Sequence, residues 1–164
     1  SGGTLYTRPG GGGASDDRIQ QGAVPVKYLC NDSEKYSNGN THIVAFRYAD
    51  VLLSLAEIEN ELNGPTDKAL GYLKQITDRV GVTHTIPADI QSSKEKFKEF
   101  LLMERGRELF MEGWRRQDLI RFGKYIEFAR NRGCTAAKDH MVLFPIPPKV
   151  ITESGGVIEQ NPGY

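Results

Sequence analysis

The sequence predicts a mostly α-helical protein, and three observations lead to this fold class. Apolar residues recur at three- and four-residue steps over long stretches between residues 43 and 113. Glycine and proline end these stretches, as Asn63-Gly64-Pro65 does. Ser92, with Glu95 three residues later, forms the capping-box pattern that begins a helix. No stretch of comparable length alternates as a strand would.

The first 46 residues are expected to form a loop-rich lead-in to a helical domain at 47–164. Ser1 to Ser15 is dominated by glycine, including the run Gly10 to Gly13, and ordering such a segment costs much conformational entropy. A phosphate-binding loop is not expected here, because no Lys-Ser or Lys-Thr pair follows the glycines.

Two helices joined by a tight turn are predicted next. The first covers residues 43–62, and its inward face is expected at Phe46, Val51, Leu52, Leu55, Ile58 and Leu62. Asn63-Gly64-Pro65 ends it, because proline cannot continue a helix and glycine accepts the left-handed cap. Thr66 then caps a second helix that runs to Val80, with Ala69, Leu70, Leu73 and Ile76 facing inward. Such antiparallel pairs are the unit of tetratricopeptide-like superhelices, although one pair does not establish a repeat.

A third helix is predicted from the capping box at Ser92 to Gly113. Two shorter helices follow, at about 116–122 and 124–130, each closed by a glycine. The apolar segment Met141 to Ile146 is expected to be extended. Pro145, Pro147 and Pro148 are expected to exclude helix there and to favour an extended tail.

Charge and composition exclude several classes of function. The 164 residues include 21 Lys and Arg against 21 Asp and Glu, so the surplus of positive charge that binds nucleic acid is lacking. No apolar run approaches the roughly 20 residues that span a bilayer, and the N-terminus lacks the pattern of a signal peptide. The two cysteines and three histidines stand apart at no metal-ligand spacing, so neither a metal nor another cofactor is expected.

Three glutamates lie four residues apart on the predicted third helix, and therefore share one face: Glu104, Glu108 and Glu112. Glycoside hydrolases use paired carboxylates, but these must face each other across a cleft, which one row on a helix cannot provide. Arginines are frequent nearby, Arg105 and Arg115 among them, so a structural ion network is the favoured interpretation, with ligand contact and catalysis as alternatives. If Arg115 is buried against a carboxylate, its replacement by alanine should cost about 3 to 5 kcal/mol.

Three ordered motifs occupy residues 47 to 164. Arg47 to Leu53, followed by Ala56-Glu57, is similar to a "RYADVLLxxAE" helix. A second string, "ER…EL…EG.R..DL.R.G", runs from Glu104 to Gly123. The third combines the "LFPIP" that begins at Leu143 with the terminal "QNPGY". Together they resemble the SusD/RagB family of outer-membrane nutrient-binding lipoproteins, although members often carry aromatic residues where this chain has Arg116 and Gln117.

The resemblance implies a helical fold with tetratricopeptide-like pairs and long irregular loops, of which this chain holds the C-terminal portion. It implies a non-catalytic protein at the cell surface, attached to the outer membrane through a lipid on an N-terminal part not contained here. Such a protein binds a glycan or a peptide without a cofactor and delivers it to a SusC-like TonB-dependent transporter. An alternative is a helical interaction scaffold that contacts the transporter, with ligand binding in the N-terminal part.

Seven residues of the second motif would tie the third and fourth helices together as a structural ion network: Glu104, Arg105, Glu108, Glu112, Arg115, Asp118 and Arg121. Ligand contacts are expected on loops instead. The candidates are Tyr6, Arg8, Tyr36 and Asn38, because sugar recognition combines an aromatic platform with planar hydrogen-bonding groups.

Overall fold

The computed structural model describes Lys27, residues 44–79 and residues 86–164. Contacts divide the chain into residues 1–44 and 45–164. Within the described residues the regular structure is entirely helical, which confirms the predicted fold class. The predicted division into a lead-in at 1–46 and a helical domain at 47–164 stays a prediction, because most of the lead-in lies outside the described residues.

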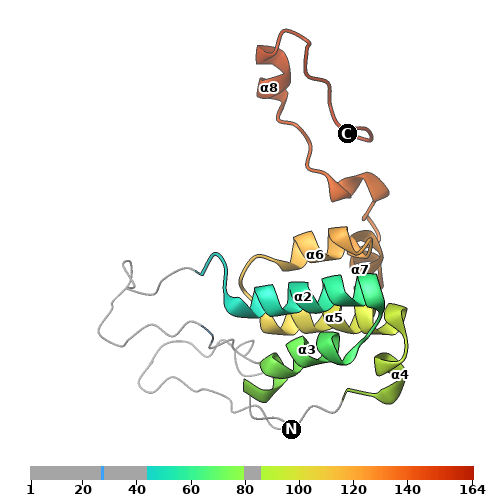
Figure 1. The fold of residues 1–164 in the computed structure, drawn as a ribbon. Helices are drawn as coiled ribbons and strands as arrows, with labels where there is room; N and C mark the ends of the chain where they lie inside the picture. Colours follow the sequence, from blue (N-terminus) through green and yellow to red (C-terminus); the bar gives the residue numbers. More distant parts are fainter. Residues whose placement is uncertain (1–26, 28–43, 80–85) are drawn as a thin grey trace, which may run out of the picture. The chain divides into compact units, whose positions relative to one another are not determined.

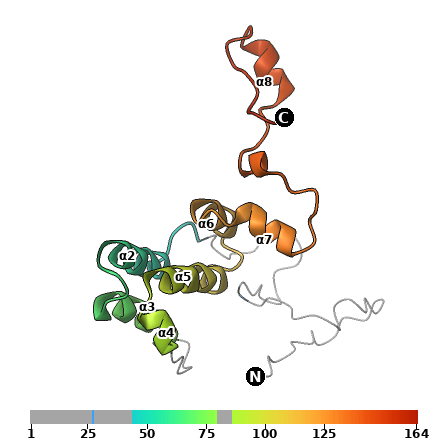
Figure 2. The same cartoon turned by 90° about the vertical axis from the view of Figure 1, so that its right-hand side faces the viewer.

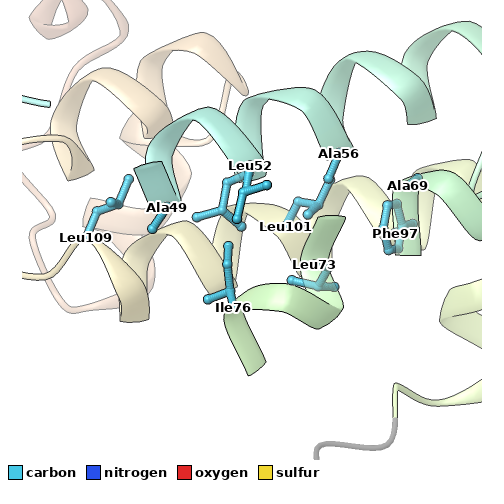
Figure 3. Close-up of a cluster of buried hydrophobic side chains, with 10 residues drawn as sticks. Ala49, Leu52, Ala56, Ala69, Leu73, Ile76, Phe97, Leu101 and Leu109 are labelled. Atoms are coloured by element: carbon cyan, nitrogen blue, oxygen red, sulfur yellow. The ribbon is translucent and has the colours of Figure 1, made fainter. Parts of the chain in front are cut away.

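Three helices enclose the hydrophobic core: α2 (Tyr48–Asn63), α3 (Asp67–Arg79) and α5 (Lys94–Glu108). α2 packs against both α3 and α5, and the views of Figures 1 and 2 agree on this arrangement. Figure 3 shows side chains of all three helices meeting in the core. The turn between α2 and α3 depends on Gly64, whose φ of 83° suits glycine and whose N–H donates to the Asn60 carbonyl at 3.0 Å.

The inward face of α2 differs from the prediction. Leu52 is buried as expected, but its buried neighbours are Ala49, Leu53, Ala56 and Asn60. The other five predicted core residues are exposed, namely Phe46, Val51, Leu55, Ile58 and Leu62. The helix also begins at Tyr48 rather than Ile43, after Arg47 in extended conformation. α2 carries two apolar stripes, and the stripe that contains two alanines is the one that permits close approach of α3 and α5.

The predicted start and end of α5 are both corrected. The capping side chain is Ser93 rather than Ser92, and its Oγ accepts from the Lys96 N–H at 3.3 Å. Ser92 instead follows α4 (Ala88–Gln91), a short helix that the sequence did not predict. α5 ends at Glu108, before the predicted Gly113, and turns follow in which Met111 adopts a φ of 63°.

Two short helices follow close to their predicted positions, α6 (Arg115–Arg121) and α7 (Tyr125–Asn131). Figure 2 shows them succeeding one another after α5. The expectation of an extended tail is partly wrong, because Met141 belongs to η1 (Asp139–Val142) and a further helix, α8 (Pro148–Glu153), is present. Pro148 is compatible with that helix, since a first-turn proline lacks only an N–H that has no partner within the helix.

The terminal residues pair with the LFPIP segment through side chains. Gln160 accepts from the Ile146 N–H at 2.8 Å and donates to the Ile146 carbonyl at 2.9 Å. Asn161 donates to the Phe144 carbonyl at 2.7 Å, and the Tyr164 hydroxyl donates to the Leu143 carbonyl at 2.7 Å. The two halves of the third motif therefore form one structural unit, which we call the C-terminal clasp.

Candidate functional site

Five charged side chains form a continuous chain of ion pairs between α2, α5 and α6. Arg105 lies at its centre, with Nε 2.9 Å from Oδ2 of Asp118 and Nη2 2.7 Å from Oδ1 of Asp50. Arg121 extends it, because its Nη2 lies 3.0 Å from Oδ1 of Asp118 and 2.9 Å from Oε2 of Glu57. Its Nη1 contacts the other oxygen of Glu57, which makes that pair bidentate. We call these five residues the charge chain.

The centre of the charge chain is withdrawn from water. The side chains of Arg105 and Asp118 are only 3% and 2% exposed. Buried charges are tolerated only when paired, and here Asp118 accepts from two guanidinium groups while Arg105 also reaches the Ser54 hydroxyl at 3.3 Å. The hydrogen bond to Glu57 raises the pKa of Arg121, against the effect of burial and with the help of Asp118. The three helices are thus joined by ion pairs that depend on one another.

Arg115 occupies a position that differs from the expectation. Its Nη1 donates to the Leu102 carbonyl at 2.7 Å, and its guanidinium carbon lies 4.9 Å from the ring centre of Phe128. Within the described part of the chain it forms no ion pair with a carboxylate. Burial lowers the pKa of Arg115, the charge of Asp118 opposes this, and the charge of Arg132 adds to it.

A second group of ion pairs lies where α2 begins and α5 ends. Nε of Arg47 lies 2.8 Å from Oε2 of Glu112, and its Nη1 lies 2.5 Å from Oε1 of Glu108. Arg79, the last residue of α3, reaches the same Glu108 oxygen at 2.7 Å. Burial works to lower the pKa of Arg47, but the hydrogen bonds with Glu112 and Glu108 outweigh it and leave the pKa raised. We call Arg47, Arg79, Glu108 and Glu112 the rim cluster.

The three glutamates of the hydrolase hypothesis are all engaged with arginines. Glu104 pairs with Arg107 of the same helix at 2.6 Å, while Glu108 and Glu112 belong to the rim cluster. None of the three side chains is more than 15% exposed. A hydrolase requires two carboxylates that face each other across an open cleft, so this arrangement contradicts the hypothesis for these residues.

The structure adds partners that sequence reasoning did not assign to the network. Four of them lie on α2 or just before it, and they recur at three- and four-residue steps: Arg47, Asp50, Ser54 and Glu57. That spacing defines a polar stripe on one face of the helix and could have indicated them. The fifth, Arg79, carried no such signal in the sequence.

The four candidate ligand contacts, Tyr6, Arg8, Tyr36 and Asn38, lie outside the described residues. Among the residues that are described, no three His, Cys, Asp or Glu side chains are grouped so that they could hold a metal ion. Over the same residues, no helix combines the length and the apolar character needed to cross a membrane.

Fold and charge chain together define a helical domain whose inward-facing charges join its helices to one another. The chain matches the SusD family over residues 2–132, and it belongs to that family. The resemblance that the three motifs indicated is therefore confirmed.

Several relatives come from Formosa agariphila. SusD-like protein P25 is 32% identical over 143 residues, which is 82% of this chain and 27% of that protein. SusD-like protein P38 is 39% identical over 93 residues, which is 54% of this chain and 18% of that protein. SusD-like protein P2 is 26% identical over 135 residues, which is 76% of this chain and 26% of that protein. The matches thus span about a quarter or less of these relatives, and no solved structure matches the chain significantly.

Proposed function

We propose that this chain is a helical scaffold region of a non-catalytic nutrient-binding protein. The observation that carries the proposal is that the four carboxylates of the second motif, Glu104, Glu108, Glu112 and Asp118, are each paired with an arginine. Carboxylates that are engaged in ion pairs and shielded from solvent do not flank a glycosidic bond across an open cleft, as a hydrolase requires. Membership of the SusD family supports the binding role.

The proposal extends to a protein as long as the SusD-like relatives, of which these 164 residues form one part. We call it the family-length protein. That protein lies at the cell surface, attached to the outer membrane by a lipid, and binds a glycan or a peptide. It passes this ligand to a SusC-like TonB-dependent transporter, and it uses no cofactor. Tyr6, Arg8, Tyr36 and Asn38 are the proposed contacts, while the charge chain and the rim cluster hold the helices of the domain to one another.

A comparison of two asparagine variants tests the proposed contacts. In the family-length protein, Asn38→Ala should weaken the binding of an oligosaccharide about 3- to 10-fold, the effect of one lost hydrogen bond. Asn131→Ala, at an exposed residue of α7, is the matched control and should leave binding unchanged. Affinity is measured by isothermal titration calorimetry. The ligand is the one among maltoheptaose, cellohexaose, xylohexaose and a casein digest that binds the unsubstituted protein. Equal affinities of the two variants would remove Asn38 from the site.

A second candidate function is an interaction scaffold that contacts the transporter while other parts of the family-length protein bind the ligand. The exposed apolar face of α2 favours it, because contiguous apolar surface marks interaction sites. Copurification separates the two candidates. If this second function holds, charged substitutions on that face release the transporter without changing ligand affinity.

A further inference from the structure

Two arginines at the ends of α6 and α7 share one aromatic ring. The guanidinium carbon of Arg115 lies 4.9 Å from the ring centre of Phe128, and that of Arg132 lies 4.2 Å from the same centre. Within the described part of the chain, neither side chain forms an ion pair with a carboxylate. We call Arg115 and Arg132 the arginine pair.

The carboxylates that the structure places near the arginine pair are engaged elsewhere. Asp118 favours the charged form of Arg115, but its two oxygens accept from other arginines at 2.9 and 3.0 Å. On α7, Glu127 pairs with Lys124 at 3.1 Å. After burial, which has the largest effect, the charge of Arg132 also lowers the pKa of Arg115, so the two guanidinium groups repel each other. A bound anion would relieve this repulsion.

The arginine pair has N–H groups that no described residue uses. Nη1 of Arg115 donates to the Leu102 carbonyl at 2.7 Å, while Nη2 contacts only the sulfur of Met103, a weak acceptor, at 3.8 Å. The side chain of Arg132 donates to no described residue. Guanidinium groups match the paired oxygens of a carboxylate or a sulfate, so these N–H groups are suited to an anionic ligand.

The position of Arg115 is fixed by all three surrounding helices. A Cβ at Gly106 of α5 would lie 2.6 Å from Nη1 of Arg115, so glycine at this position makes room for the guanidinium group. The Leu102 carbonyl of α5 and the Phe128 ring of α7 hold it there. A donor that is already held in place loses less conformational freedom on binding than a free surface side chain.

The surroundings favour an acidic saccharide over an acidic peptide as the ligand. The rings of Phe128, Tyr125 and Phe144 each have a guanidinium carbon within 5.2 Å of their centre, so their faces are partly taken. Peptides and proteins are recognised mainly through apolar anchors in pockets or through the edge of a sheet, and the described residues contain no strand. What this surface offers is N–H donors, which suit a hydroxyl-rich chain that carries anionic groups.

We propose that the arginine pair binds an anionic group, a carboxylate or a sulfate, on the glycan that the family-length protein takes up. This inference rests on the proposed function and narrows its ligand to an acidic glycan.

Isothermal titration calorimetry of the family-length protein tests the proposal with matched ligands. Hexagalacturonate carries carboxylates, whereas its methyl ester is uncharged; sulfated maltohexaose carries sulfates, whereas maltohexaose is uncharged. At least one charged ligand should bind about 10-fold more tightly than its uncharged counterpart, as expected for a hydrogen bond between charged groups. Added salt should reduce this difference, because it screens exposed charges.

Two substitutions on α7 assign the effect to the arginine pair. Arg132→Gln should weaken binding of the charged ligand about 10-fold, with the Tm within about 2 °C because Arg132 is exposed. Arg130→Gln, the control, removes the same charge two residues away, but Arg130 already pairs with Asp139 at 3.0 Å. It should change the affinity by less than about twofold.

Four results would overturn the proposal. Equal losses in the two variants would mean that overall charge, rather than a site, attracts the ligand. Hexaglutamate that binds more tightly than both charged saccharides, and depends on Arg132, would identify an acidic peptide as the ligand. A lower Tm of Arg132→Gln with unchanged affinity would show that Arg132 pairs with another part of the protein. The fourth result is no preference for either charged saccharide; the proposed function then still stands if an uncharged oligosaccharide binds, and fails as well if no oligosaccharide or peptide binds.

Discussion

Replacement of Asp118 by asparagine removes one negative charge from the buried centre of the charge chain at almost constant side-chain size. Both Arg105 and Arg121 then lose an anionic partner, at 2.9 and 3.0 Å. Loss of one partner from a buried ion pair costs about 3 to 5 kcal/mol, because the remaining charge stays out of water. Arg105 retains Asp50 at 2.7 Å and Arg121 retains Glu57, so the expected loss lies at the low end, about 3 kcal/mol.

Urea denaturation followed by circular dichroism measures this loss, provided that the m-value is unchanged. Asp139→Asn is the matched control, since Asp139 makes the same kind of contact with Arg130 at 3.0 Å but is 88% exposed. An exposed pair contributes at most about 1 kcal/mol. A loss under about 1 kcal/mol for Asp118→Asn, or equal losses in both variants, would refute the view that the charge chain joins α2, α5 and α6.

Four further predictions concern other parts of the domain. Arg115→Ala should cost about 1 to 2 kcal/mol rather than 3 to 5, because a hydrogen bond to a carbonyl is lost and no ion pair is broken. In the native chain, a Cβ at residue 106 would lie 2.6 Å from Nη1 of Arg115, so Gly106→Ala is not expected to stabilise the protein. In the Arg115→Ala variant that contact is absent, and Gly106→Ala should stabilise α5 by about 0.5 to 1 kcal/mol in thermal denaturation. Stabilisation of equal size in both proteins would contradict the contact between residue 106 and Arg115. Gln160→Ala should speed hydrogen exchange of the Ile146 amide about 10-fold without moving the urea midpoint, and unchanged exchange would argue against the C-terminal clasp. Hydrogen bonds with Lys98 and Lys94 lower the pKa of Glu61 below its usual 4.5. The stabilising effect of the Glu61 carboxylate is therefore present above pH 4.5 and is lost as the pH falls through the lowered pKa. The Tm difference between the native chain and Glu61→Gln should vanish in acid, and a difference that persists there would contradict the role of these ion pairs.

The positions of the longer helices could be predicted from the sequence, but the inward face of α2 could not. Apolar periodicity shows that a segment is helical, but it does not show which of two apolar stripes is buried. The stripe with the larger side chains, such as Leu55 and Ile58, is favoured in a prediction from sequence, whereas the buried stripe contains Ala49 and Ala56. Which stripe is buried depends on how closely α3 and α5 can approach. Similarly, two adjacent serines could each begin α5, and the short helix α4 that precedes them makes Ser93 the cap.

The charged residues of α5 and α6 could be found from their motif, whereas their partners could not. Asp50 lies 55 residues from Arg105, and Glu57 lies 64 residues from Arg121. No local spacing rule connects residues so far apart, because their contact depends on how the helices pack. Membership of the motif also does not determine what a residue contacts. Arg115 belongs to the same motif, yet its neighbours in space are the Leu102 carbonyl and the Phe128 ring.

The central claim, non-catalytic binding of a nutrient, is tested most directly by titrating the family-length protein with oligosaccharides and peptides and then analysing the recovered ligand by chromatography. We predict saturable binding of at least one of them, with the ligand recovered at its original length. Failure to bind any oligosaccharide or peptide, or the appearance of shorter products, would contradict the claim.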